Sequence, residues 1–196
     1  MKKSMMVFTA IVLLVAGGAQ AAFITAVSGA DINTSFSSGV LTLSDTIELV
    51  VTKGTQVSYN NTTFSFSAEL LADNSVGGQA SGVFGNGAFT ITASDSTVLL
   101  SGQVQQITLE GIGGGTLLGG AGVVSIDAGS LLADIAPGYT QGEVVAITFQ
   151  ISPGPIADFS GDYTGRTNLT IVPIPEPATM TLLGVGVAAL MRRKRG

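Results

Sequence analysis

The sequence FSFSAEL, residues 64–70, alternates apolar and polar side chains at every position. Successive side chains of a β-strand point to opposite faces, so this period of two indicates a strand with one apolar face and one wet, hydroxyl-bearing face. The same alternation occurs at residues 89–94 and 145–151. Since antiparallel sheets commonly bury one face and expose the other, these segments predict half-buried antiparallel strands.

The rest of the sequence predicts further strands and the turns between them. Less regular strands are expected at residues 40–52, 98–109, 122–126 and 166–172. The pair Asn86-Gly87 predicts a hairpin turn, and Lys53-Gly54 and Asp73-Asn74 mark other turns. A short helix is possible near residues 129–135. Seven or eight strands without a long amphipathic helix predict an all-β fold, specifically an antiparallel, jelly-roll-like β-sandwich.

The composition excludes several classes of function. Between residues 22 and 172 only Lys53 and Arg166 are basic, against twelve acidic residues, so nucleic-acid binding is not expected. The chain contains no His, Cys or Trp. It therefore lacks the commonest general base, any disulfide and the strongest aromatic platform for sugars. We expect no enzyme activity and no cofactor.

The N-terminal segment, residues 1–21, has the pattern of a signal peptide. Two lysines precede an apolar run at residues 5–16, and Ala19 and Ala21 give the small-x-small cleavage pattern. Cleavage after Ala21 would leave one ectodomain at residues 22–172.

The C-terminal segment, residues 173–196, has a different pattern. Pro175, Glu176 and Pro177 form a stiff motif, because each proline fixes φ and donates no N–H. An uncharged apolar run follows at residues 178–191 and predicts a short transmembrane helix of about 21 Å. The basic tail, residues 192–196, should stay cytoplasmic under the positive-inside rule. Its four bases are Arg192, Arg193, Lys194 and Arg195.

This tail resembles the PEP-CTERM sorting signal of bacterial surface proteins. The resemblance implies that Pro175, Glu176 and Pro177 are recognised by an exosortase, a membrane-embedded transpeptidase-like enzyme. Residues 178–191 would be a temporary membrane anchor, and the four bases a cytoplasmic stop. The resemblance also implies that the protein is delivered to the outer surface or the exopolysaccharide matrix. Some tails of this family carry an ice-binding protein label, which describes the tail and not a site on the rest of the chain.

Few residues of the expected ectodomain suggest chemistry. Asp158 and Asp162, with nearby carbonyls, are weak candidates for Ca²⁺, although their spacing is not that of an EF-hand. The glycine-rich stretch at residues 111–122 lacks the P-loop and dinucleotide spacings and predicts a flexible loop or bend. Thr90-Ile91-Thr92 resembles one rung of an ice-binding surface, and one rung is not an array.

The sequence thus predicts an exported, non-enzymatic surface or matrix protein with a structural or adhesive role. The alternative is a polysaccharide-binding module, with Ca²⁺-dependent binding as one option. In both cases exosortase is a transient partner, and the C-terminal helix anchors the chain in the membrane before processing. Neither hypothesis identifies a ligand.

Overall fold

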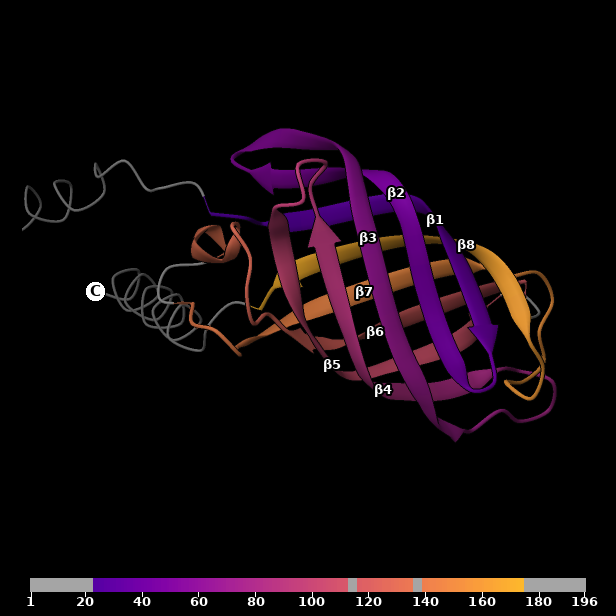
Figure 1. Cartoon of the computed structure of the whole chain (residues 1–196). Coiled ribbons are helices and arrows are strands. Elements are labelled where there is room, and N and C mark those ends of the chain that lie inside the picture. The colour runs from indigo at the N-terminus through magenta and orange to yellow at the C-terminus, as the bar shows by residue number, and fades with distance from the viewer. Residues whose placement is uncertain (1–22, 113–115, 136–138, 175–196) are drawn as a thin grey trace, which may run out of the picture.

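The fold is built almost entirely of antiparallel strands. The computed structural model describes residues 23–112, 116–135 and 139–174. The strands are β1 (Ala26–Ser37), β2 (Val40–Lys53), β3 (Thr55–Asp73), β4 (Ser81–Thr92), β5 (Val98–Ile112), β6 (Leu117–Ser125), β7 (Val144–Ser152) and β8 (Tyr163–Pro173), with a 3-10 turn, η1 (Leu132–Asp134), before β7. Each strand pairs with its neighbour in the sequence, as Figure 1 shows.

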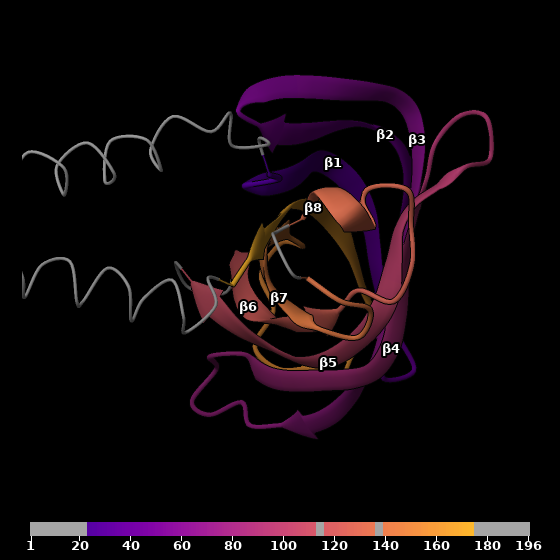
Figure 2. The same cartoon turned by 90° about the vertical axis from the view of Figure 1, so that its left-hand side faces the viewer.

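The expectation of an all-β, antiparallel fold is confirmed, but the β-sandwich is wrong. β1 also pairs with β8, from Val27↔Ile171 to Phe36↔Tyr163, so the sheet closes on itself as one barrel. Figure 2 shows the strands arranged as a ring around one interior. The alternation of apolar and polar residues is the same in a sandwich and in a barrel, because both have one buried face. The pairing of the first and last strands distinguishes the two.

β1 was not predicted from the sequence because its alternation changes phase. Val27 is buried, Ala30 and Asp31 are both exposed, and Ile32 and Phe36 are buried. The pairing register of β1 shifts here against both neighbours, and Asp31 has a positive φ of 57°. A β-bulge of this kind inserts an extra residue and rotates the following side chains to the other face. The period of two is therefore lost in the sequence although the strand continues.

The predicted hairpin turn at Asn86-Gly87 is also wrong, because both residues lie within β4. Asn86 has a positive φ of 50°, and the register between β3 and β4 shifts between Ser67 and Glu69. The pair therefore forms a bulge instead of a turn. A Cβ added at Gly87 would lie 1.8 Å from the Ser67 carbonyl oxygen, which explains why glycine occupies the position.

The other turn predictions agree better with the structure. Lys53-Gly54 connects β2 to β3, and β3 ends at Asp73. η1 lies within the expected segment near residues 129–135. The glycine-rich stretch is not only a loop, since Gly119, Gly120 and Gly122 lie in β6. A Cβ at Gly122 would lie 2.1 Å from the carbonyl oxygen of Gln106, so these glycines allow close strand packing.

The barrel interior is a packed apolar core. Its largest fully buried side chains are Phe36, Phe64, Phe66, Phe84, Phe89, Ile32, Leu41, Leu43, Leu49, Ile91, Leu100 and Ile107. Thr34 and Thr167 are also buried and share a hydrogen bond between their hydroxyls at 2.5 Å. An eight-stranded barrel is just wide enough for side chains to fill.

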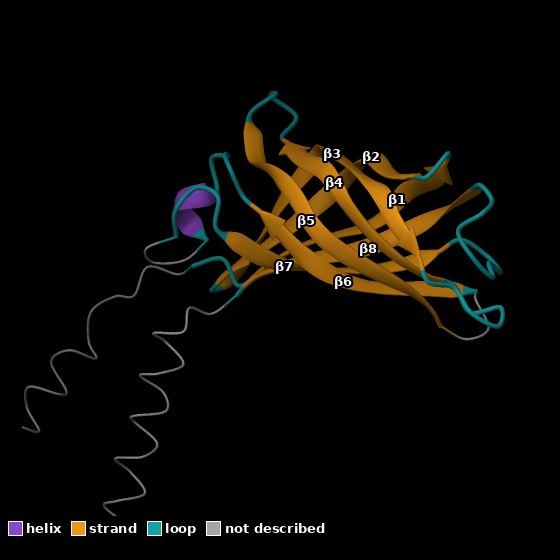
Figure 3. Ribbon diagram, turned by 90° about the horizontal axis from the view of Figure 1, so that it is seen from below, coloured by secondary structure: helices purple, strands orange, loops and turns teal. Residues whose placement is uncertain are grey.

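The two ends of the barrel are closed by different loops. At one end, which we call the terminal end, the described chain both begins and finishes (Figure 1). The β6–β7 loop and η1 close this end (Figure 3), and the loop residues Ile126, Leu131 and Ile135 are buried there. Lys53 forms an ion pair of 2.6 Å with Asp134 there.

At the opposite, distal end, the β7–β8 loop inserts Phe159 into the barrel. The Phe159 ring packs edge-on against Phe36 and Phe84, with centroids 5.6 and 5.3 Å away. The loop is held by a 3.1 Å hydrogen bond from the Phe159 N–H to the Asp73 carboxylate. Phe159 thus acts as an apolar plug of the distal end.

Candidate functional site

The residues predicted to direct sorting lie outside the described residues. These are Pro175, Glu176, Pro177, Arg192, Arg193, Lys194 and Arg195, together with the signal-cleavage residues Ala19 and Ala21. The expected signal helix and the expected transmembrane helix, residues 178–191, also lie outside. Within the described part of the chain, no helix has the length and apolar character needed to cross a membrane.

The weak Ca²⁺ candidates, Asp158 and Asp162, accept hydrogen bonds from different parts of the chain. Asp158 accepts hydrogen bonds from the N–H and the hydroxyl of Ser160, at 2.9 and 2.6 Å. These hydrogen bonds lower the pKa of Asp158. Asp162 instead accepts from the Ser37 hydroxyl, at 2.9 Å, and from the Ser38 N–H. Both carboxylates stabilise turns, and residues 23–112, 116–135 and 139–174 contain no cluster of three metal-ligating side chains.

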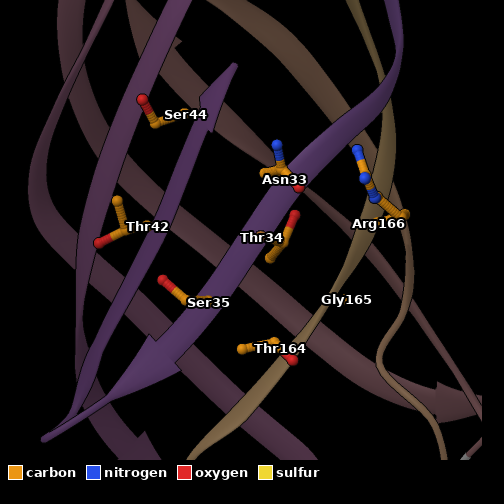
Figure 4. A pocket seen from close by; sticks show the side chains of 8 residues that line it. All are labelled: Asn33, Thr34, Ser35, Thr42, Ser44, Thr164, Gly165 and Arg166. Carbon is orange, nitrogen blue, oxygen red and sulfur yellow. The ribbon is translucent and has the colours of Figure 1, made fainter.

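The most distinctive polar site is a hollow on the outer wall, over strands β8, β1 and β2. It has a volume of about 450 Å³ and is lined by Asn33, Thr34, Ser35, Thr42, Ser44, Thr164, Gly165 and Arg166. In Figure 4 these residues come from neighbouring strands and surround one depression. No periodic motif in the sequence marks the hollow, because strands distant in the sequence form it.

The bulge in β1 borders this hollow at Asn33. Between Ser28 and Thr34, β1 has no regular pairing with β2, so a side chain replaces the missing backbone acceptor. The Asp45 carboxylate accepts the Asn33 N–H at 3.0 Å and the Asn33 side-chain amide at 2.6 Å. Similarly, the Asn168 amide oxygen accepts the Asp31 N–H at 3.0 Å. The local polar residues thus satisfy the backbone groups that the bulge leaves unpaired.

Arg166 is the one basic side chain that lines the hollow. Its guanidinium donates to the Asp31 carbonyl oxygen at 2.9 Å and lies 3.4 Å from the Asp45 carboxylate. The side chain remains 53% exposed. A guanidinium has five N–H donors, which is more than these contacts use. Arg166 can therefore still donate to a bound hydroxyl or carboxylate.

Hydroxyl groups continue from the hollow around one side of the barrel. Because outward residues of paired strands lie opposite one another, they form ranks across the strands. One rank runs Thr164, Ser35, Thr42, Ser67, a second runs Ser44, Ser65, Thr90, Ser101, and a third runs Thr46, Thr63, Thr92. We call these eleven residues the hydroxyl face. The face mixes serine with threonine on the wall of the closed barrel.

Comparison with known proteins identifies one segment. Residues 173–195 match the family model of the PEP-CTERM protein-sorting motif. No curated protein and no solved structure matches the chain. The expected resemblance of the tail is thereby confirmed, and the motif implies exosortase-dependent export and sorting to the cell surface.

Proposed function

We propose that the chain is a non-enzymatic surface or extracellular-matrix protein with a structural or adhesive role. The single observation that carries this proposal is the PEP-CTERM match at residues 173–195, which implies the route of delivery. The barrel supports it, because its interior is filled by side chains and its outer wall carries the hydroxyl face.

Replacement of the sorting motif tests this proposal. Changing Pro175, Glu176 and Pro177 together to alanine should leave the protein in the membrane fraction and deplete it from the surface and medium. The control replaces Pro153 and Pro155, two prolines of the β7–β8 loop outside the motif, with alanine. Unchanged delivery of the motif variant, with the control delivered normally, would contradict an exosortase-dependent route.

The second candidate function is polysaccharide binding at the hollow around Arg166. The observation that favours it is the combination of four hydroxyl-bearing side chains on the outer wall, an amide and a half-exposed guanidinium around one depression. The hydroxyl and carboxylate groups of a polysaccharide can form hydrogen bonds with hydroxyl, amide and guanidinium side chains.

A glycan array probed with and without a chelator tests this second function. If the site is built from side-chain hydrogen bonds, Arg166→Ala should weaken glycan binding. The chelator should leave glycan binding unchanged. Loss of binding with the chelator would instead favour a Ca²⁺-dependent module. Absence of binding in both conditions would remove polysaccharide recognition and leave the structural role.

A further inference from the structure

One part of the barrel has a strand edge without a partner. β3 pairs with β2 from Thr55 to Glu69, with one register shift, but its pairing with β4 starts only at Thr63↔Thr92. The first eight residues of β3, Thr55–Thr62, therefore have one edge with which no described residue pairs. We call this segment the free edge. In Figure 1 the β2–β3 hairpin that carries it extends at the upper left beyond the arrowhead of β4.

The free edge has none of the usual protections against pairing. Isolated edges in natural proteins commonly carry lysine, other charges or proline. The sequence of the free edge, TQVSYNNT, contains no charged residue and no proline. All of its residues except Tyr59 and Thr62 are exposed, including Val57 at 44%. Such an edge is a template for another extended strand.

The sequence of the free edge is complementary to itself. If two copies pair in antiparallel fashion around Ser58, then Ser58 faces Ser58, and Gln56 faces Asn60 on the outer surface. On the inner surface, the exposed Val57 of each copy faces the half-buried Tyr59 of the other. Pairs of aromatic and β-branched residues across strands are favourable, as are hydrogen bonds between polar side chains.

The length of the free edge matches this arrangement. Pairing around Ser58 uses residues 55–61 of each copy and stops before Thr63, where β4 occupies the edge. At the far end, Asn61 has a positive φ of 53°, and the register with β2 shifts between Ile47 and Leu49. This bulge ends the regular part of the edge, so a longer or shifted pairing has no straight strand to use.

We propose that two copies of this chain associate through the free edge, as a two-fold symmetric dimer centred on Ser58. A two-fold contact uses the same patch on both copies and leaves no further free edge. The product is therefore a closed dimer and not a fibre. This inference does not rest on the proposed function, since it follows from strand pairing alone.

Single cysteines test the dimer and its register, because the native chain has no cysteine. With Ser58→Cys, the two introduced thiols lie directly opposite each other, at a Cα separation of about 4.5–5.5 Å that a disulfide can bridge. In the exported protein under mild oxidation, Ser58→Cys should become a covalent dimer. Gln56→Cys is the matched control on the same strand and surface. Its two copies would lie about 13 Å apart and should not cross-link.

Charge substitutions test the same contact without cross-linking. Ser58→Lys places two ammonium groups opposite each other and should weaken dimerisation roughly fivefold or more in sedimentation experiments. A mixture of Ser58→Lys and Ser58→Glu proteins should restore association as a mixed dimer. Ser67→Lys lies on β3 where both edges are paired, and should leave the dimer unchanged.

The proposal is overturned if the exported protein sediments as a monomer at all concentrations tested. It is also overturned if Gln56→Cys cross-links as readily as Ser58→Cys, or if Ser58→Lys leaves an observed dimer intact. A monomer would mean that the free edge stays unused or is covered by the chain's own residues beyond the described ranges.

Discussion

At the level of single residues, the threonine pair Thr34 and Thr167 tests how much a buried hydrogen bond stabilises the folded protein. Thr34 and Thr167 are buried in an apolar interior, where their hydroxyls bond each other and the Thr34 hydroxyl also donates to the Ile32 carbonyl oxygen. Removal of one hydroxyl leaves the second without that partner in a low-dielectric site. Removal of both replaces a polar pair by an apolar one of similar shape, which is far less costly.

We expect Thr34→Val to lower the free energy of unfolding by about 1–3 kcal/mol. The double variant Thr34→Val/Thr167→Val should be less destabilised than the sum of the two single variants. Urea unfolding of all four proteins measures this coupling. Strict additivity of the single effects would show that the two hydroxyls do not interact.

Asp73 links pH to the plug at the distal end. Hydrogen bonds from the side chain and N–H of Ser75, and then from the Phe159 N–H, hold the pKa of Asp73 below its ordinary value of 3.8. The folded state therefore binds fewer protons than the unfolded state near this pH. The stabilisation is present above about pH 4 and is lost as the pH falls through the lowered pKa.

Hydrogen exchange at the Phe159 amide measures this effect. After correction for intrinsic exchange, the protection of this amide should fall as the pH drops below about 4. Asp73→Asn should remove most of that dependence. Asp95→Asn serves as the control, because the Asp95 pKa is also lowered, by Thr97, in the β4–β5 turn at the terminal end. Equal behaviour of the two variants would contradict a specific role of Asp73 at the plug.

At the level of elements, bulges determine how far the sequence predicts the strands. β2 (Val40–Lys53), β5 (Val98–Ile112), β7 (Val144–Ser152) and β8 (Tyr163–Pro173) lie close to their predicted ranges, although the pairing of β2 with β3 and of β5 with β6 also contains register shifts. β1 was missed and β4 was interrupted in the prediction, since a bulge changes the phase in one and Asn86-Gly87 suggests a turn in the other. The hollow, which borders the β1 bulge, could not be predicted either. Its lining comes from three strands whose adjacency requires barrel closure.

The bulge in β4 gives a testable prediction at the level of elements, on the stability of variants at Asn86 and Gly87. Asn86→Gly should preserve the barrel, because glycine adopts a positive φ without cost. Asn86→Val should lower the free energy of unfolding by about 1–2 kcal/mol, because a β-branched residue at positive φ is strained. Gly87→Ala should be at least as harmful, given the 1.8 Å approach to the Ser67 carbonyl oxygen. Thermal unfolding compares the three, and a neutral Gly87→Ala would contradict the close packing at the bulge.

At the level of the whole molecule, barrel closure limits how the protein can interact. A closed barrel has no long sheet edge, so contacts with a matrix have to use the outer wall, the loops or the free edge at Thr55–Thr62. The hydroxyl face and the free edge lie on different parts of β3, since Ser65 and Ser67 are paired on both sides. Dimerisation and contact with a polyhydroxylated partner are therefore compatible, and a dimer would present two such faces.

The route of delivery was predictable at this scale, whereas the identity of a partner was not. The tail motif is local in sequence, and it is confirmed at residues 173–195. A surface made of serine and threonine hydroxyls has few distinguishing features in sequence, because such residues are typical of any exposed strand face.

The intact mass of the protein released from native cells tests the central claim most directly. Exosortase processing predicts a mature protein whose C-terminus lies near residues 175–177 and which lacks the basic tail at residues 192–196. A mass that retains Arg192, Arg193, Lys194 and Arg195 would contradict processing. The chain would then be a simple C-terminally anchored membrane protein, and delivery to an extracellular matrix would lose its main support.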